Sequence, residues 1–463
     1  MDRVLVADAA KHADKEILVK GWVHARRDHG KLIFIDLRDR SGLLQVVFWG
    51  GGDAELFKQA GNLRSEFVVA ITGTVQKRQD NQINPDLPTG TVELAAKKLE
   101  ILNESDTPPF EIDSPLDNAG ENIRLQYRYL DLRSQRMQNN IRMRHKFIKE
   151  IRNFLDDEGF VEIETPILAK SSPEGARDFL VPSRLSQGQF YALPQAPQQF
   201  KQISMIAGFE KYYQIAHCFR DEDLRGDRQP EFTQLDIEMS FVDQEDILDV
   251  NERLFKTAIA KLYPNKKMPD KFPRMTYDEV MEKYKTDKPD IRKNKEDNDE
   301  LAFLWVTDFP VFEKGDDSKL TFAHNPFATP KDEDVEKLFS DDQATLLSIR
   351  AKCYDLVLNG YELSSGSIRI HEPRIQKRVF EMMGLNDQQV EERFGNFLKA
   401  FKYGAPPHGG MAPGLDRVIM ILQEEPNIRE VIAFPKNGEM RDLMFDSPGP
   451  ATDQQLKELG IKL

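Results

Sequence analysis

The chain has few cysteines, no internal repeat and no apolar run long enough to cross a bilayer. Cys218 and Cys353 are its only cysteines in 463 residues. One pair of thiols provides neither a disulfide framework nor a thiolate metal cluster. The first residues also lack the basic, apolar and small-residue order of a secretory signal. We therefore expect a cytoplasmic protein with no membrane association and two buried thiols.

Positive charge is also in short supply, since the formal net charge is −14. Taken alone, this balance argues against a polyanionic partner. It does not exclude one, because nucleic-acid affinity depends on local basic surface that a whole-chain sum can hide. The hydrophobic content of 40% predicts well-formed cores, and the charged content of 31% is typical of a soluble protein.

The first hundred residues are rich in β-forming sequence. Five such runs follow one another between Glu16 and Glu104, with a helix-like stretch at 53–62 between the third and the fourth. This order is typical of an OB-fold barrel. Such barrels bind single-stranded nucleic acid by stacking bases on aromatics in a basic groove. The groove residues would be Arg26, Arg27, Lys31 and Phe34. A small structural barrel with Phe34 in its core explains the pattern equally well.

A composition change separates this region from the rest of the chain. Residues 105–135 are rich in proline and acids, so the sequence predicts domains at 1–104 and 136–463 joined by a linker. In the second domain, Asn139–Gly159 has helical spacing and Gly159 suits its C-terminal cap. The strand-like run that follows contains Pro166, which indicates an edge or an interface.

The most informative stretch is Phe219–Glu238, two strand-like runs around a charged loop. A hairpin loop near ten residues is functional or disordered, because ordinary hairpin loops have two to five. It carries Arg220, Arg225 and Arg228 among four acids. Side chains two apart on a strand share a face, so Gln234 and Asp236 are expected on the same side. A solvated charged loop remains the alternative.

Several motifs in order resemble a known family. The helix and strand ending at Pro166, the FRDEDLR…EFTQLD hairpin and GMAPGLDR at Gly410–Arg417 are similar to motifs 1, 2 and 3 of class II aminoacyl-tRNA synthetases. Four intervening stretches look like bacterial aspartyl-tRNA synthetases; they are Ser172–Arg184, Leu193–Gln202, Thr286–Arg292 and Asn427–Lys436. The resemblance implies an α+β chain. An anticodon-binding five-stranded OB barrel would precede an antiparallel sheet flanked by helices, and the chain would form a homodimer through 139–166.

This resemblance also assigns an ATP site. Arg220 would contact the α-phosphate, Arg417 the γ-phosphate, and Arg225 or Arg228 the pyrophosphate end. Phe232 would stack on adenine with Arg417 on its other side. The catalytic set would be Arg220, Glu222 and Arg417. The ATP contacts would be Arg220, Glu222, Arg228, Gln229, Phe232, Glu362, Gly414, Asp416 and Arg417.

The amino-acid and metal sites follow in the same way. Gln234 and Asp236 match the pair that binds the substrate ammonium, and Lys201 and Arg369 match the cations that bind its side-chain carboxylate. Asparagine would leave two buried cations uncompensated, so rejection by roughly 10⁴-fold is expected. The full aspartate set is Glu174, Gln198, Lys201, Gln234, Asp236, His324 and Arg369. Asp355 and Glu362 match acids that hold Mg²⁺, which suits two carboxylates and phosphate oxygens.

In the barrel, the residues that match anticodon-reading positions are Arg27, His29, Phe34, Gln45 and Glu93. A histidine at position 29 is frequent in relatives that also charge tRNA-Asn. The chain departs from the family pattern at Ala196, Asn325, Ser364, Ser365 and Pro413. It also has only Lys293–Ala302 where bacterial members carry a large inserted domain.

The resulting hypothesis is a ligase that joins L-aspartate to tRNA-Asp in two steps, through aspartyl-adenylate made from ATP. Charging of tRNA-Asn is an open extension. One alternative is a paralogue that passes aspartyl-adenylate to another acceptor, although such paralogues commonly lack the barrel. Another is a degenerate homologue that only binds RNA, which predicts loss of Arg220 or Arg417; both are present.

Overall fold

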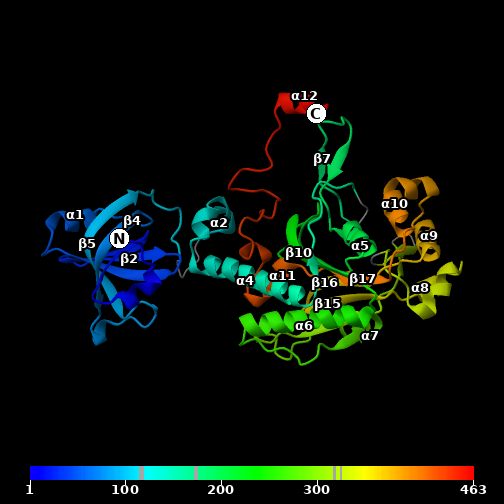
Figure 1. Ribbon diagram of the computed structural model, residues 1–463, viewed down its shortest axis with the longest axis horizontal. Helices are drawn as coiled ribbons and strands as arrows, with labels where there is room; N and C mark the ends of the chain where they lie inside the picture. Colours follow the sequence, from blue (N-terminus) through cyan, green and yellow to red (C-terminus); the bar gives the residue numbers. More distant parts are fainter. Residues whose placement is uncertain (114–118, 172–175, 316–319, 324–325, 463) are drawn as a thin grey trace. The chain divides into compact units, whose positions relative to one another are not determined.

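The computed structural model describes residues 1–113, 119–171, 176–315, 320–323 and 326–462 (Figure 1). They form two compact units, Met1–Ser134 and Gln135–Leu463. Residues 105–113 and 119–134, from the stretch predicted to be a linker, belong to the first unit. None of the described helices is both long enough and apolar enough to cross a membrane.

The first unit contains a closed five-stranded barrel with strand order β1-β2-β3-β5-β4. Its strands are β1 (Glu16–Asp28), β2 (Leu32–Asp39), β3 (Gly42–Trp49), β4 (Val68–Lys77) and β5 (Val92–Asn103). Helix α1 (Ala54–Gly61) lies between β3 and β4, and the Asp53 side chain caps it by accepting from Glu55 N and Leu56 N. The predicted OB-fold barrel is confirmed.

Strand residues of the barrel alternate between its interior and its outer surface. In β2, Ile33, Ile35 and Leu37 are buried in the core, whereas Phe34 between them is only half-buried. Period-two alternation is what a strand with one buried face requires. Phe34 therefore faces outward, and the alternative that placed it in the core is wrong.

The second unit is built on an eight-stranded sheet with order β11-β12-β15-β16-β17-β10-β9-β6. The six central strands pair antiparallel, whereas the outermost pairings, β11 with β12 and β6 with β9, are parallel. The strands are β6 (Val161–Glu162), β9 (Lys211–Phe219), β10 (Glu231–Ser240), β11 (Arg274–Thr276), β12 (Phe303–Thr307), β15 (Cys353–Leu358), β16 (Tyr361–Ile368) and β17 (His408–Met411). The expected sheet flanked by helices is confirmed.

Three helices cover one face of this sheet: α4 (Gln135–Asp157), α6 (Gln244–Leu262) and α11 (Leu415–Leu422). Their apolar residues join those of the strands in one core that includes Ile151, Leu254 and Val418. The first unit also contains α2 (Glu121–Gln126) and α3 (Arg128–Asp131). The other α-helices and short strands of the second unit are β7 (Leu180–Pro182), β8 (Phe190–Ala192), α5 (Gln198–Ile206), α7 (Tyr277–Tyr284), β13 (Phe312–Lys314), β14 (Leu320–Phe322), α8 (Gln343–Leu347), α9 (Pro373–Met382), α10 (Asp387–Phe401) and α12 (Asp453–Leu459).

The predicted hairpin is formed by β9 and β10. Their pairing runs from Phe219 opposite Glu231 to Lys211 opposite Met239. Leu235, Ile237 and Met239 of β10 belong to the helix-covered core. Because side chains alternate along a strand, Gln234, Asp236 and Glu238 point to the opposite face. That face of the sheet forms the floor of a pocket.

Candidate active site

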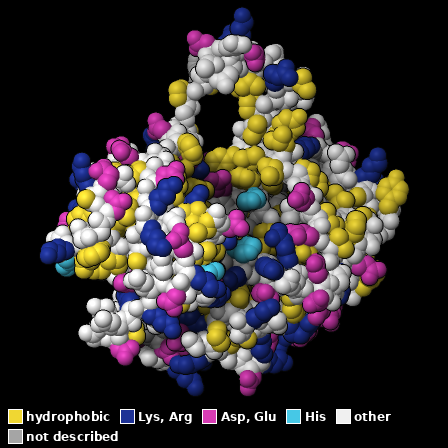
Figure 2. Space-filling model, turned by 60° about the vertical axis from the view of Figure 1, so that its left-hand side comes forward, with side chains coloured by type: hydrophobic (Ala, Val, Ile, Leu, Met, Phe, Trp, Pro, Cys, Tyr) yellow, Lys and Arg dark blue, Asp and Glu magenta, His cyan; other side chains and the backbone are white. Residues whose placement is uncertain are grey.

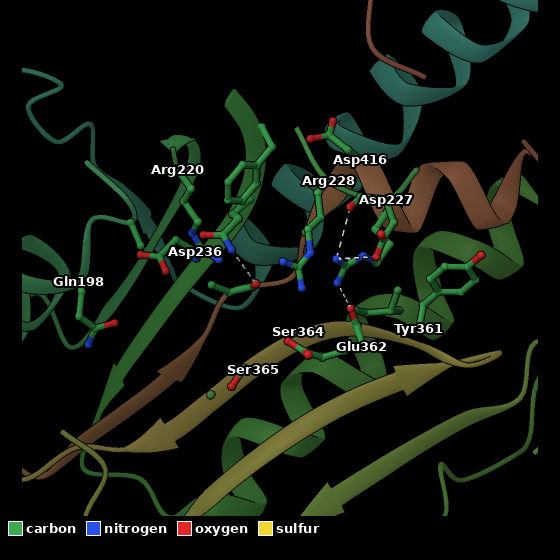
Figure 3. A pocket seen from close by; sticks show the side chains of 18 of the residues that line it. Gln198, Arg220, Asp227, Arg228, Asp236, Tyr361, Glu362, Ser364, Ser365 and Asp416 are labelled. Carbon is green, nitrogen blue, oxygen red and sulfur yellow. Dashed lines mark hydrogen bonds and ion pairs between the residues drawn. The ribbon is translucent and has the colours of Figure 1, made fainter. Parts of the chain in front are cut away.

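A pocket of about 820 Å³ lies over the face of the sheet that the helices of the core leave uncovered (Figure 3). Its lining comes from the β9–β10 loop, β10, β16, α5 and the start of α11. Residues more than two hundred positions apart in the sequence therefore meet in it, such as Gln198 and Arg417. Every residue expected at ATP lines the pocket: Arg220, Glu222, Arg228, Gln229, Phe232, Glu362, Gly414, Asp416 and Arg417.

Two arginines of the pocket, Arg228 and Arg417, are held by acidic neighbours. Arg228 lies 3.5 Å from a carboxylate oxygen of Glu222. Arg417 lies 3.0 Å from the Asp227 carboxylate and also donates to the Glu362 carbonyl oxygen (Figure 3). Acids of the same loop thus fix the guanidinium groups beside the pocket. A polyanionic ligand can replace those acids with stronger, bidentate contacts.

The ring of Phe232 lies beside an arginine of its own hairpin. The Arg220 guanidinium lies over its ring, 5.1 Å from the centroid. Arg220 follows β9 directly and Phe232 pairs with Cys218, so the hairpin itself brings these two side chains together. The expected stack places adenine between Phe232 and Arg417, and it stays a prediction; the Arg417 guanidinium is held by Asp227 and the Glu362 carbonyl oxygen.

Asp416 is engaged within the protein. One carboxylate oxygen accepts a 2.8 Å hydrogen bond from Thr233 N, and the other pairs with Arg144 of α4. The residue is buried. These contacts join α11, β10 and α4, so Asp416 positions the strand that carries Phe232 and Gln234.

Four buried charges cluster at the end of the pocket near α5; Lys201, Asp236 and Arg369 line the pocket, and Glu238 contacts the two cations. Lys201 Nζ lies 2.6 Å from Asp236 Oδ1 and 3.4 Å from Glu238 Oε2. Arg369 donates to both carboxylate oxygens of Glu238, at 2.9 and 3.1 Å. Burial raises the pKa of Asp236, although Lys201 opposes the shift. Burial also disfavours the charge of Glu238, but Arg369 and Lys201 together hold its pKa below the usual value.

This cluster corrects one expectation from the sequence. Lys201 and Arg369 are not uncompensated cations awaiting a substrate, because Asp236 and Glu238 already balance them. The sequence reasoning assigned Glu238 no role. Glu238 follows Asp236 by two positions and Gln234 by four. Because side chains alternate along a strand, this spacing alone places Glu238 on the same face as the other two.

Five buried polar atoms among the described lining residues make no hydrogen bond. They are Gln198 Nε2, Gln229 Nε2, Asp236 Oδ2, Ser364 Oγ and Arg417 Nε. Buried polar atoms without partners are rare in native proteins and need an explanation. Both donors and acceptors are left over, so the pocket suits a ligand that carries acceptors and donors of its own. Three residues that depart from the family pattern also line this pocket. They are Ala196, Ser364 and Ser365, and Figure 3 labels the two serines.

The expected metal ligands lie on neighbouring strands. Glu362 of β16 lines the pocket, and Asp355 of β15 is buried opposite Ser365. No cluster of three or more His, Cys, Asp or Glu in the described ranges suits a metal ion. Mg²⁺ needs no such cluster, since one or two carboxylates plus substrate phosphates are its usual donors. The oxygen donors present fit that ion. Glu174, His324 and Asn325 lie outside the described residues.

The barrel presents the residues expected to read an anticodon on its outer surface. Arg27 donates to both oxygens of Asp36, at 2.6 and 2.9 Å, and lies 3.4 Å from Gln45 Oε1. Gln45 donates in turn to Glu93 at 2.9 Å. His29 meets Phe34 edge to face, with ring centroids 5.6 Å apart. Arg78, which sequence reasoning did not single out, extends this network because it lies 3.6 Å from Glu93.

Two families match the chain. Residues 120–438 match "tRNA synthetases class II (D, K and N)", and residues 17–102 match "OB-fold nucleic acid binding domain". Aspartate–tRNA ligase of Staphylococcus saprophyticus is 42% identical, with 97% of each chain covered. Aspartate–tRNA(Asp/Asn) ligase of Caldanaerobacter subterraneus is 42% identical, covering 98% of this chain and 96% of that one. The first alignment runs over 575 positions, so the relative has a long stretch with no counterpart among these 463 residues.

Solved structures share the fold at lower identity. Asparaginyl-tRNA synthetase from Pyrococcus horikoshii, solved with asparaginyl-adenylate, has a TM-score of 0.74 at 22% identity, covering 94% of this chain and 98% of that one. A putative aspartyl-tRNA synthetase from Leishmania major has a TM-score of 0.75 at 23% identity, covering 94% of each chain.

Proposed function

The chain belongs to the aspartate–tRNA ligases of the class II tRNA synthetases, and from this premise we propose how its pocket and barrel divide the reaction. The enzyme joins L-aspartate to tRNA-Asp in two steps through aspartyl-adenylate, with ATP giving AMP and pyrophosphate. The observation behind this assignment is one pocket with arginines at one end and a buried, balanced charge cluster at the other. The alternatives without tRNA charging are not favoured, since the family match extends over both units.

Activation of aspartate requires positioning and charge neutralisation. The substrate carboxylate is already an anion when it attacks the α-phosphorus, so no general base is needed. Arg220 neutralises the α-phosphate, Arg417 the γ-phosphate, and Arg228 or Arg225 the pyrophosphate end. Glu222, 3.5 Å from Arg228, orients that guanidinium. Planar forks suit phosphate oxygens better than lysine does.

The remaining residues bind adenine, the metal and the amino acid. Phe232 stacks on adenine, with Gln229 and Gly414 beside the nucleotide. Glu362 and Asp355 would hold Mg²⁺, which supplies positive charge to the phosphates. Gln234 and Asp236 bind the substrate ammonium, in keeping with the unbonded Asp236 Oδ2, and Gln198 belongs to the same amino-acid site. Lys201 and Arg369 bind the side-chain carboxylate, and Glu174 and His324 complete the amino-acid site.

Aspartate-dependent exchange of pyrophosphate into ATP, followed by transfer to tRNA, tests this function. Exchange with aspartate and not asparagine is expected. Absence of exchange would contradict the activation step, whereas exchange without transfer to tRNA-Asp would point to another acceptor.

Recognition of tRNA-Asn is the open part of specificity. The relative from Caldanaerobacter is named for both tRNAs, and His29 contacts Phe34 on the anticodon face. We propose that the enzyme accepts both. Charging of the two transcripts side by side decides it, and charging of tRNA-Asp alone would refute the dual role.

We also propose a homodimer in the cytoplasm. The region from β6 onward leaves several large apolar side chains exposed, including Val161, Ile167 and Leu168, as an interface would. Both cysteines are buried thiols, as a reducing compartment permits. Sedimentation velocity at micromolar concentration would reveal a dimer; a monomer there would contradict this proposal.

A further inference from the structure

Trp49, at the end of β3, is 63% exposed. The other two tryptophans are less accessible: Trp305 is fully buried, and Trp22 is half-buried with the Arg133 guanidinium over its ring. A single exposed apolar side chain is ordinary on a protein surface. Trp49 differs because of the face on which it lies and because of how its ring is held.

The face follows from the alternation of β3. Leu44, Val46 and Phe48 are buried in the barrel, so Gln45, Val47 and Trp49 point outward. Gln45 is already part of the expected anticodon surface through its contacts with Arg27 and Glu93. Trp49 therefore belongs to the same outer face.

The register places Trp49 beside Phe34. Phe34 pairs with Val47, and Leu32, two residues before Phe34, pairs with Trp49. Positions two apart on one strand are separated by about 7 Å. Val47 is the partner of Phe34, and Trp49 is the next side chain after Val47 on the same face of β3. This separation is comparable to that between neighbouring nucleotides in an extended strand.

Backbone contacts hold the indole in place. The three residues after Trp49 are glycines, and Gly50 N donates to Lys31 O at 2.8 Å while Gly52 N donates to Trp49 O at 3.2 Å. A Cβ built on Gly51 would lie 2.4 Å from a Trp49 ring atom, so the ring packs against the bare backbone of that turn. Such support reduces the entropy that a flexible side chain would lose on binding.

The chemistry around the ring favours RNA over a protein partner. His29 and Lys31 are exposed in the turn before β2, and Arg27 lies on the facing strand. Figure 2, which turns the left-hand side of Figure 1 forward, shows basic, acidic and hydrophobic side chains mixed across the visible surface. Aromatic platforms between cations are how barrels of this fold hold single-stranded nucleic acid.

We propose that Trp49 is a second stacking platform, which takes the base of an anticodon-loop nucleotide next to the one that Phe34 contacts. The inference rests on the proposed anticodon role of the barrel and extends it by one nucleotide. Stacking accepts any base, so Trp49 contributes affinity and leaves base identity to residues such as Gln45 and Glu93.

Fluorescence of the full-length protein tests the proposal directly, because Trp49 is the most exposed of the three tryptophans. Titration with the anticodon stem–loop of tRNA-Asp should quench the emission, and Trp49→Phe should remove most of that change while retaining affinity. Trp49→Ala should weaken binding roughly tenfold, as expected for one lost stack. Gly51→Ala should act in the same direction, since it displaces the ring.

Two controls separate this proposal from the function on which it rests. Tyr129→Ala removes another exposed aromatic of the same unit and should leave affinity unchanged. Phe34→Ala tests anticodon binding itself. If Phe34→Ala weakens binding but Trp49→Ala does not, the second platform is refuted and the barrel keeps its role. If the wild-type protein does not bind the stem–loop, the anticodon role fails.

An abasic scan locates the nucleotide. At one loop position, removal of the base should weaken binding to the wild type but not to Trp49→Ala. That position should be next to the one at which base removal no longer matters in Phe34→Ala. Equal losses in wild type and Trp49→Ala at every position would overturn the proposal. If Trp49→Ala lowers the unfolding temperature, the quenching experiment with Trp49→Phe tests the proposal instead. Unchanged quenching in Trp49→Phe would then overturn it.

Discussion

At the scale of single residues, the buried charges near α5 occur in pairs. Lys201 and Arg369 are balanced by Asp236 and Glu238, so neither cation is buried without a counter-charge. An unpaired ion in a protein interior costs several kcal/mol, whereas a paired and hydrogen-bonded one is tolerated. Aspartate specificity therefore depends on how a bound carboxylate shares these cations with Glu238.

Glu238→Gln should impair amino-acid binding and spare nucleotide binding. The amide keeps the shape but removes the charge that holds Arg369, so the guanidinium loses its fixed orientation. We expect the KM for aspartate to rise at least tenfold in pyrophosphate exchange while the KM for ATP changes little. Glu231→Gln, at an exposed position of the same strand, is the matched control. Equal KM values for aspartate in both variants would contradict the role of Glu238.

Arg417→Ala should abolish adenylate formation and leave tRNA binding largely intact. The guanidinium is the expected γ-phosphate ligand, and loss of one charge-neutralising group typically costs two to three orders of magnitude, roughly 10²–10³, in kcat. Pyrophosphate exchange and a tRNA filter-binding assay measure the two properties separately. Arg374→Ala removes an exposed arginine of α9 and serves as the control. Parallel loss of both activities would indicate misfolding instead.

At the scale of secondary-structure elements, α4 and α11 hold β10 in place. Arg144 of α4 pairs with Asp416 of α11, which also accepts from Thr233 N of β10. Nearby, Arg136 and Asn140 of α4 bind Glu425, just beyond α11. The strand that carries Phe232 and Gln234 is thus aligned from the helix-covered side of the sheet.

Arg144→Leu should leave the buried Asp416 carboxylate without its cation. Breaking such a pair costs about 3 kcal/mol or more when the remaining charge stays buried. We expect a lower unfolding midpoint in urea together with a raised KM for ATP. Arg142→Leu alters an exposed residue of the same helix and should change neither. Unchanged stability in Arg144→Leu would show that the pair is not needed to hold β10.

At the scale of the whole molecule, the chain divides its chemistry between two units. The pocket and all its described lining residues belong to 135–463, and the anticodon-face residues belong to 1–134. Each unit has its own hydrophobic core. A domain with its own core can in principle fold alone.

The fragment 135–463 should therefore activate aspartate without charging tRNA efficiently. We expect pyrophosphate exchange within about threefold of the intact enzyme, because no pocket residue is removed, and a much higher KM for tRNA-Asp. That threefold margin corresponds to less than 1 kcal/mol. The intact chain assayed in parallel is the reference. A folded fragment without exchange would show that activation needs the barrel.

The order of elements and most of the pocket residues were predictable from the sequence. Alternation in β1–β5 and β10 is local, and it placed Phe34, Gln234 and Asp236 on the correct strands. The resemblance to class II synthetases then named pocket residues from distant segments, including Arg369 and Arg417. For these, chain order and side-chain chemistry were sufficient.

Tertiary structure alone decided the partners of those residues. Glu238 faces Lys201 and Arg369 only because β10, α5 and the end of β16 converge. The Asp416–Arg144 pair and the Arg220–Phe232 contact likewise depend on packing between distant or folded-back segments. Trp49 ends β3, and the barrel register sets it one side-chain position from the partner of Phe34. Local sequence determines which way a side chain points, but its electrostatic neighbours come from long-range pairing, which no local pattern records.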